Sequence, residues 1–176
     1  MELIFRRGHI DELPIAINLL KQAAEMLKAK KVNQWPFWLN PSVEKLNWIK
    51  SGFENSEFYF VENSQQILVG MFRLLDNDEL YWGKQITKAN YIHSLVIEKS
   101  FSGQQLGKVI IKQIEQILIK KGVSILRLDC NGSNKKLCQY YELQNFSKVG
   151  EKQMPDSLNN LYEKVITKSP IDPPLV

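Results

Sequence analysis

The stretch between residues 91 and 121 has a composition and spacing that suit an anion-binding site. Its apolar, β-branched run at 92–97 predicts a buried strand. After a short polar turn, apolar residues recur at helical spacing from Leu106 to Leu118, and Gly122 follows where helices commonly end. A helix that starts directly after a tight turn leaves backbone N–H groups unpaired at its positive end. We therefore expect this turn to bind the pyrophosphate of a nucleotide-like cofactor.

The turn carries a cation that supports this interpretation. Lys108 lies in the first turn of the predicted helix, where a positive charge opposes the helix dipole unless an anion binds there. Gly103 and Gly107 flank the turn and give its backbone freedom. Taken alone, the motif fits a solvated lysine in a plain strand-to-helix turn equally well.

The spacing excludes two well-known phosphate-binding loops. The NTPase loop has four residues between its first glycine and a Gly-Lys pair, which Ser or Thr follows. Here three residues separate Gly103 from Gly107, and Val109 follows Lys108. The dinucleotide fingerprint also fails, because its second glycine would fall on Gln105.

A second pair of polar residues follows one predicted strand later. Asn134 and Tyr141 are seven residues apart, so about two helical turns bring them to one face of a helix. Asn134 is also placed to cap that helix, which alone would account for it. Tyr141 could equally be a buried aromatic residue beside Tyr140. A functional role for the two residues is better supported by their place in the chain, because they follow the anion-binding turn after one further strand.

The elements that must position these residues alternate along the chain. Helices are predicted at about 12–31, 42–52, 106–121 and 134–143, and strands at 2–6, 57–62, 67–75, 91–97, 124–129, 146–153 and 161–166. The order predicts one α/β (α+β) domain, residues 1–168, with a mixed central sheet of six to seven strands flanked by about four helices. An irregular tail follows at 169–176. The predicted loop at 31–41 holds Trp35, Phe37 and Trp38, which form either a hydrophobic plug or a substrate lid.

The bulk properties narrow the classes of partner. The 176 residues carry a formal charge of +4 with Lys and Arg scattered, which argues against nucleic acid. No apolar run is long enough to span a bilayer, and the first ten residues lack a signal-peptide core. Cys130 and Cys138 have no metal-ligand spacing. We therefore expect a cytoplasmic protein with reduced thiols, no bound metal and no membrane partner.

The two sites together resemble the GNAT superfamily of acyl-CoA N-acetyltransferases. In that family a Leu-x-Val strand precedes the motif Arg/Gln-x-x-Gly-x-Gly/Ala. Here Leu95 and Ile97 correspond to the strand, and Gly107 corresponds to the last motif position. Ser102 stands where Arg or Gln is usual, and Gln105 replaces the first motif glycine. These two departures would weaken or alter the contacts to the pyrophosphate.

The second half of the resemblance is closer. The family often has Asn, then Leu-Tyr-Glu after six residues, then Gly-Phe; this chain has Asn134, Tyr140-Tyr141-Glu142 and Asn145-Phe146. Asparagine in place of that glycine is tolerable, because it is the next residue able to adopt a positive φ. The resemblance is specific over about residues 55–166, and the rest of the chain is compatible with it.

The resemblance implies a cofactor and a mechanism. Acetyl-CoA would lie in a V between the strand ending at Ile97 and the strand at 124–129, and a backbone N–H of the first strand would polarise the thioester carbonyl. Tyr141 would protonate the departing thiolate. His93, which should alternate in phase with Leu95 and Ile97, is the expected base, with Glu98 and Asp129 as alternatives, although a core histidine is an equally good interpretation. The expected cofactor-binding residues are Leu95, Val96, Ile97, Ser102, Gly103, Gln104, Gln105, Leu106, Gly107, Lys108, Asn134 and Tyr141.

We therefore predict an N-acetyltransferase, monomeric or homodimeric, that uses acetyl-CoA to acetylate a small primary amine in a ternary complex. The alternative is a catalytically weak acyl-CoA-binding sensor or interaction module, with Trp35, Trp38 and Trp82 available to a partner. The substrate loops of such a fold are its variable part, here 31–41 and 76–90. The acidic sequence DNDELYW in the second loop favours a cationic substrate, and a solvated loop explains it as well.

Overall fold

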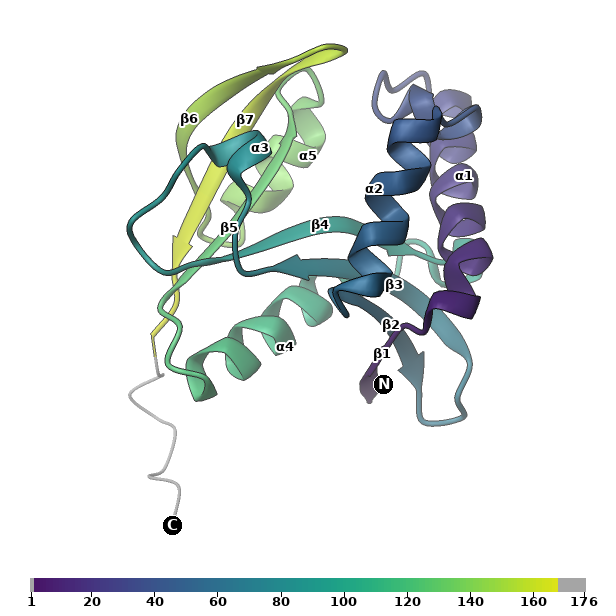
Figure 1. Cartoon of the computed structure of the whole chain (residues 1–176), viewed down its shortest axis with the longest axis horizontal. Coiled ribbons are helices and arrows are strands. Elements are labelled where there is room, and N and C mark those ends of the chain that lie inside the picture. The colour runs from purple at the N-terminus through teal and green to yellow at the C-terminus, as the bar shows by residue number, and fades with distance from the viewer. Residues whose placement is uncertain (1, 168–176) are drawn as a thin grey trace.

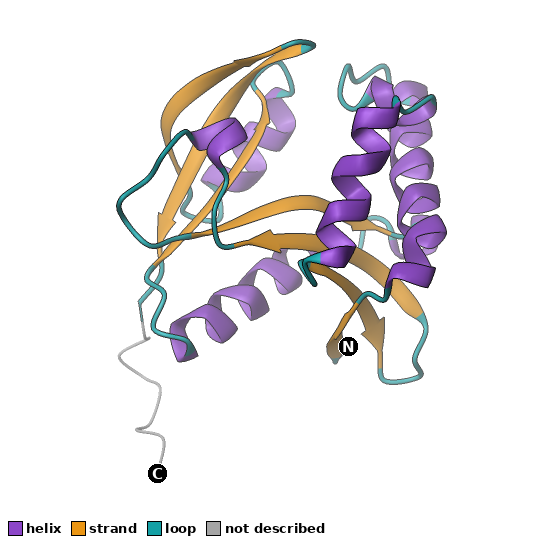
Figure 2. Cartoon of the chain, viewed as in Figure 1, coloured by secondary structure: helices purple, strands orange, loops and turns teal. Residues whose placement is uncertain are grey.

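A seven-stranded mixed sheet forms the centre of the computed structural model, which describes residues 2–167 (Figures 1 and 2). The strands are β1 (Leu3–Arg7), β2 (Phe58–Asn63), β3 (Leu68–Leu75), β4 (Asn90–Ile97), β5 (Ile125–Asn131), β6 (Ser147–Met154) and β7 (Ser157–Val165). Their order in the sheet is β1-β2-β3-β4-β5-β7-β6, and only the β4–β5 pair is parallel. The predicted mixed sheet is thus confirmed. The predicted tail, 169–176, lies outside the described residues.

In the described part of the chain, five helices flank the sheet: α1 (Leu13–Ala29), α2 (Val43–Glu54), α3 (Glu79–Trp82), α4 (Leu106–Lys120) and α5 (Lys135–Glu142). Short 3₁₀ turns lie at Ile10–Glu12, Pro36–Leu39 and Lys99–Phe101. Capping explains where two helices begin, because Ser42 accepts from the Lys45 N–H and Asn134 accepts from the Leu137 N–H. Within the described residues, no helix is both long and apolar enough to cross a membrane.

Two local predictions differ from the structure. The predicted loop at 76–90 contains α3, a single turn that Asp78 caps by accepting from the Tyr81 N–H. A four-residue helix is too short to produce a periodic signal. Strand β7 begins at Ser157, four residues before the predicted start, because its first part is polar and owes its conformation to the hairpin with β6.

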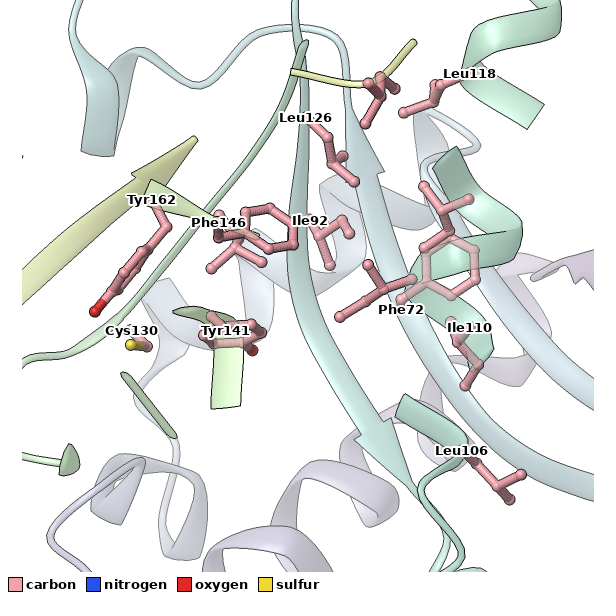
Figure 3. Packing of buried hydrophobic residues seen from close by; sticks show 14 of the residues in the cluster. Phe72, Ile92, Leu106, Ile110, Leu118, Leu126, Cys130, Tyr141, Phe146 and Tyr162 are labelled. Carbon is pink, nitrogen blue, oxygen red and sulfur yellow. The ribbon is translucent and has the colours of Figure 1, made fainter. Parts of the chain in front are cut away.

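The helices cover opposite faces of the sheet and enclose two cores. Helices α1 and α2 lie side by side on one face (Figure 1) and pack through Leu20, Ile49 and Phe53 against β2 and β3. Helices α4 and α5 pack on the other face, where Ile110 and Tyr141 belong to the larger cluster. Figure 3 shows this second core, with the Tyr141 ring among the side chains of the cluster.

The central strand β4 has two irregularities that open the sheet. It pairs with β5 only at its start, Asn90–Ile92 against Leu126–Leu128, so the two strands diverge beyond that point. Ser94 has φ +51°, and the register against β3 passes from Arg73–His93 to Met71–Val96. One extra residue on β4 therefore forms a β-bulge, which changes where the following side chains point.

The bulge makes one prediction about His93 wrong. Leu95 and Ile97 pack with the α4 side of the sheet, whereas His93 contacts Trp48 of α2 on the opposite face. Strict alternation would put all three on one face, but the extra residue at Ser94 shifts the alternation by one. His93 nevertheless lines the cavity described in the next section, although the predicted alternation did not account for its position.

Candidate active site

A cavity of about 570 Å³ lies where β4 and β5 diverge. One half is formed by β4, β5 and the start of α5, including 95–97, Asn134 and Tyr141. The other half is formed by the end of α1, the segment 33–38, α2, α3 and the β6–β7 turn, together with the side chains of His93 from β4 and Asp129 from β5. We call these the cofactor half and the acceptor half. Figure 1 shows the β6–β7 tip and the α1–α2 connection at the same end of the molecule.

The cofactor half offers unpaired backbone groups. Beyond Ile92, β4 has no ladder partner on its β5 side among the described residues, so the edge of 93–97 faces the opening between the strands. The turn at 102–108 follows at the end of β4 and leads into α4; its described residues are not part of the cavity lining. Within the described chain, the backbone N–H groups of Gln104, Gln105, Leu106 and Gly107 donate no hydrogen bond.

Two residues of the turn have a left-handed backbone. Gln105 has φ +57° and Gly103 has φ +84°. A left-handed backbone is unfavourable for a residue with a Cβ, by roughly 1–2 kcal/mol, so Gln105 holds a geometry that glycine would adopt more easily. The glutamine at this motif position therefore adds to the free-energy cost of forming the turn. Asn145 likewise has φ +66°, as predicted for that position.

Gly107 has a packing role that the sequence did not indicate. A Cβ at this position would lie 2.7 Å from the Tyr140 hydroxyl oxygen and 3.7 Å from Tyr140 Cζ. The missing side chain thus allows Tyr140 of α5 to reach the first turn of α4. Any larger residue here would require the Tyr140 hydroxyl to shift.

Asn134 connects the cofactor half to the acceptor half. Its side-chain oxygen caps α5 through the Leu137 N–H at 3.2 Å, and its amide nitrogen donates to Gln34 Oε1 at 2.6 Å. Nearby, the Asn131 amide donates to the carbonyl oxygen of Asn33 at 2.9 Å. These bonds hold the aromatic loop after α1 against the loop between β5 and α5. Asn134 therefore caps α5, as predicted, and also links the start of α5 to the loop after α1.

Tyr141 is buried with its hydroxyl group at the cavity. Its ring packs edge-on against Phe146, with centroids 5.9 Å apart, and lies 6.1 Å from the Tyr162 ring (Figure 3). Within residues 2–167, no group makes a hydrogen bond with the Tyr141 hydroxyl, which is not fully buried, and the residue lines the cavity. Burial, with a smaller effect of Cys130, raises the pKa of Tyr141 well above its usual value. The phenol therefore stays protonated and can donate.

His93 lies between two carboxylates. Its Nε2 is 2.8 Å from Asp78 Oδ2, and its Nδ1 is 3.6 Å from Asp129 Oδ1. A carboxylate only accepts, so Nε2 carries a proton and donates it to Asp78. The distance from Nδ1 to Asp129 is too long for a direct hydrogen bond. That nitrogen and Asp129 are therefore the members of the cluster placed to exchange a proton with a ligand in the cavity.

Opposing effects set the protonation of this cluster. Burial alone would lower the pKa of His93, but the hydrogen bond to Asp78 and the charge of Asp129 outweigh it, so the pKa is raised. Burial also raises the pKa of Asp129, against the effects of the His93 charge and of a 2.6 Å hydrogen bond from Asn159. Ligand atoms of Asp78, His93 and Asp129 all lie within 4.8 Å of one another, which would also suit a metal ion. The 2.8 Å hydrogen bond satisfies His93 and Asp78 without one.

Both predicted substrate loops, 31–41 and 76–90, contribute to the acceptor half, but no role of its own was predicted for Asp78 or Trp48. Asp78 caps a helix that has no periodic signal, and Trp48 lies on an ordinary amphipathic helix. Tyr81, whose ring centroid is 5.0 Å from that of His93, lies in the segment predicted to be a loop. Glu98, an alternative base, instead accepts from the Ser100 N–H at 2.8 Å and is not part of the described lining. Asp129, the other alternative, does line the cavity.

Comparison with protein families agrees with the fold. The sequence pattern of the acetyltransferase (GNAT) family matches residues 19–146. The chain is 24% identical over 153 residues to the uncharacterized N-acetyltransferase YesJ of Bacillus subtilis (strain 168). That match covers 85% of this chain and 82% of YesJ.

Solved structures have the same fold. An acetyltransferase of the GNAT family from Listeria monocytogenes 4b F2365 is 26% identical with a TM-score of 0.76, covering 94% of this chain and 95% of that one. A spermidine N-acetyltransferase from Vibrio cholerae, solved with CoA and spermine, is 14% identical with a TM-score of 0.67, covering 93% of this chain and 95% of that one. At that identity the likeness concerns the fold alone. The chain belongs to the GNAT acetyltransferase family and is an acetyl-CoA-dependent acyltransferase.

Proposed function

We propose that the protein transfers the acetyl group of acetyl-CoA to the primary amine of a small molecule, by direct attack in a ternary complex. The observation that carries this proposal is one cavity lined both by Tyr141, whose phenol has no hydrogen-bond partner among residues 2–167, and by His93, a histidine held by a carboxylate. A proton donor and a proton acceptor beside the same opening are what an acyl transfer from sulfur to nitrogen requires.

The cofactor would lie along the unpaired edge of β4. Backbone groups of Leu95, Val96 and Ile97 would pair with the pantetheine arm, and an N–H of this edge would polarise the thioester carbonyl. The turn from Ser102 to Lys108 would hold the pyrophosphate, supported by its unoccupied N–H groups and the start of α4. Asn134 would border the same arm.

The reaction then needs three proton transfers. The substrate ammonium loses one proton to the His93–Asp129 pair, and the neutral nitrogen attacks the thioester carbon. A C–N bond forms, the C–S bond breaks, and Tyr141 gives its proton to the departing thiolate. The acylated nitrogen loses its second proton, which restores the Tyr141 phenol through solvent. No metal ion is needed for these steps, and a small-molecule amine is the only partner they require. We infer that the reaction takes place in the cytoplasm, because Cys130 and Cys138 are both free thiols and cytoplasmic proteins keep their cysteines reduced.

An acyl-CoA-binding sensor is the second candidate, favoured by Ser102 where the family has Arg or Gln. A serine at this position gives the pyrophosphate no charge to pair with. The two functions differ in one result: an enzyme releases free thiol when acetyl-CoA and its amine are both present, and a sensor does not.

Two measurements test the proposal. Acetyl-CoA should raise the melting temperature, because a ligand that binds only the native state stabilises it. Ser102→Arg should enlarge that shift by adding a positive charge at the turn. A panel of primary amines should then identify acceptors by free thiol release. An unchanged melting curve with millimolar acetyl-CoA would contradict cofactor binding, and binding without thiol release for any amine would favour the sensor.

A further inference from the structure

We propose that the acceptor is a singly charged primary amine attached to a flat apolar body, such as a phenylalkylamine or an indolylalkylamine. This proposal rests on the proposed function and specifies its substrate class. It excludes polyamines and aminoglycosides as the preferred acceptors.

The acceptor half is walled by aromatic side chains from three segments. Trp35 and Phe37 come from the loop after α1, Trp48 from α2 and Tyr81 from α3, and each is only half-buried while lining the cavity. Half-buried aromatic rings at a cavity wall keep apolar surface available for a ligand. An acceptor with a flat apolar body would cover this surface, whereas a flexible polyamine would leave much of it in contact with water.

The rings surround the site of proton exchange. The centroids of Trp48 and Tyr81 lie 5.8 and 5.0 Å from that of His93. One face of Trp48 is already covered by the Arg73 guanidinium, 4.0 Å from the ring centroid, so Tyr81 is the ring with more freedom to contact a ligand. An amine bound beside His93 and Asp129 therefore has an aromatic ring next to its first carbon atoms, and this ring can also attract the ammonium form.

The charges around the cavity suit one positive charge rather than several. The acidic residues of the described lining are Glu44, Asp129 and Asp156, and the basic ones are Lys30, Lys45 and His93. Among these carboxylates only Asp129 is removed from solvent, with 7% of its side chain exposed, whereas Glu44 and Asp156 are exposed. Lys45 lies 4.2 Å from the Phe37 centroid, where it would repel a second cationic group of the ligand.

The cavity is already closed on one side, which limits the size of the acceptor. The bonds from Asn131 to Asn33 and from Asn134 to Gln34 hold the aromatic loop in place. The volume of about 570 Å³ must also admit the acetyl-bearing end of the cofactor. An acceptor of one ring or one fused ring pair needs less of this space than a three-ring aminoglycoside does.

The test compares four amines under identical conditions: 2-phenylethylamine, tryptamine, spermidine and kanamycin. We expect kcat/KM, from free thiol release, to be at least roughly 10-fold higher for the two aryl amines, a factor that one well-buried ring can supply. The same order is expected for binding to the CoA-bound protein, measured by calorimetry. Higher kcat/KM and tighter binding for spermidine or kanamycin would overturn the proposal and leave the acetyltransferase function intact.

Variants separate the aromatic wall from a general loss of folding. Tyr81→Leu should raise KM for the aryl amines while changing the acetyl-CoA thermal shift little. The matched control is Tyr59→Leu: Tyr59 is a half-buried tyrosine on β2 that stacks on Phe72 outside the described lining, and its loss should leave KM unchanged. An equal KM for Tyr81→Leu and the wild type would contradict the proposal. If no amine releases thiol, the proposed function fails, and the calorimetric order still decides this inference.

Discussion

The two halves of the cavity are built in different ways. The cofactor half offers mainly backbone from one stretch of sequence: the edge of β4 and, beyond the cavity lining, the turn that follows it and the start of α4. The acceptor half uses side chains from seven separate segments, and Asp78, which caps α3, meets His93 of β4 and Asp129 of β5 there. A site made of backbone leaves a local pattern in the sequence, whereas a site made of side chains depends on tertiary structure to bring its members together.

The largest effect is expected from the acceptor half. His93→Gln should lower kcat/KM by about 10²–10⁴-fold, the usual contribution of a positioned base. In the wild type, kcat/KM should rise with pH through a midpoint above the ordinary value for histidine, because Asp78 and Asp129 raise the pKa of His93. Measurements of kcat/KM across pH should show that this rise is flattened in the His93→Gln variant.

The other histidine of the chain provides the control. His9 is exposed near the N-terminus, so His9→Gln should keep both the rate and the pH profile. The acetyl-CoA thermal shift should persist in both variants. A His93→Gln protein that is less stable but keeps the pH limb would identify His93 as a structural residue.

The same cluster should make folding stability depend on pH. The folded-state pKa values of His93 and Asp129 are both raised, so the folded state binds more protons than the unfolded state between the unfolded and folded pKa values. The stabilisation from His93 is therefore complete below its unfolded pKa and is lost as pH rises through the folded value. Urea unfolding at several pH values should show this fall, and His93→Gln should reduce it. A stability that rises over the same range would contradict the assigned charges.

The next effect comes from the cofactor half. Tyr141→Phe should lower turnover by roughly 10²-fold, the lower end for a general acid, because a thiolate leaves readily without help. Acetyl-CoA affinity and melting temperature should change little, since the ring remains and its hydroxyl has no partner within the described chain. Tyr140→Phe should have far less effect on turnover. Equal turnover in Tyr141→Phe and the wild type, measured where chemistry limits the rate, would exclude this role.

The difference between the halves explains what the sequence could predict. Turn residues, helix caps and β-branched runs are local signals, so the sheet, four of the five helices and the turn from Ser102 to Lys108 were recognisable. The bulge at Ser94 leaves no such signal, because serine seldom has a positive φ, and the phase of His93 was therefore predicted incorrectly. Asp78 was missed for a related reason, since its role depends on the contact with His93 across the sheet.

Gly107 tests whether the cofactor half depends on packing as well as on backbone. Gly107→Ala places a Cβ 2.7 Å from the Tyr140 hydroxyl oxygen, and overpacking of this kind typically costs about 1–3 kcal/mol. Combining it with Tyr140→Phe should recover most of that loss, because the next atom within reach is Cζ at 3.7 Å. Denaturant unfolding of both single variants and the double variant measures the coupling. Additive losses would show that the Tyr140 hydroxyl is not what requires a glycine.

The smallest effect is expected at Asn134, the residue that joins the two halves. Asn134→Ala removes both the cap of α5 and the bond to Gln34, and the lost cap should lower stability by about 1 kcal/mol. Asn134→Ser keeps a capping oxygen but is too short to reach Gln34, so its stability should stay near that of the wild type. If the bond holds the aromatic loop in place, Asn134→Ser and Gln34→Ala should each raise KM for the amine. The two changes together should do no more than either alone, because both remove one contact. Additive increases in KM would mean that Asn134 and Gln34 act on the acceptor half separately, and the loop would then owe its position to the bond between Asn131 and Asn33.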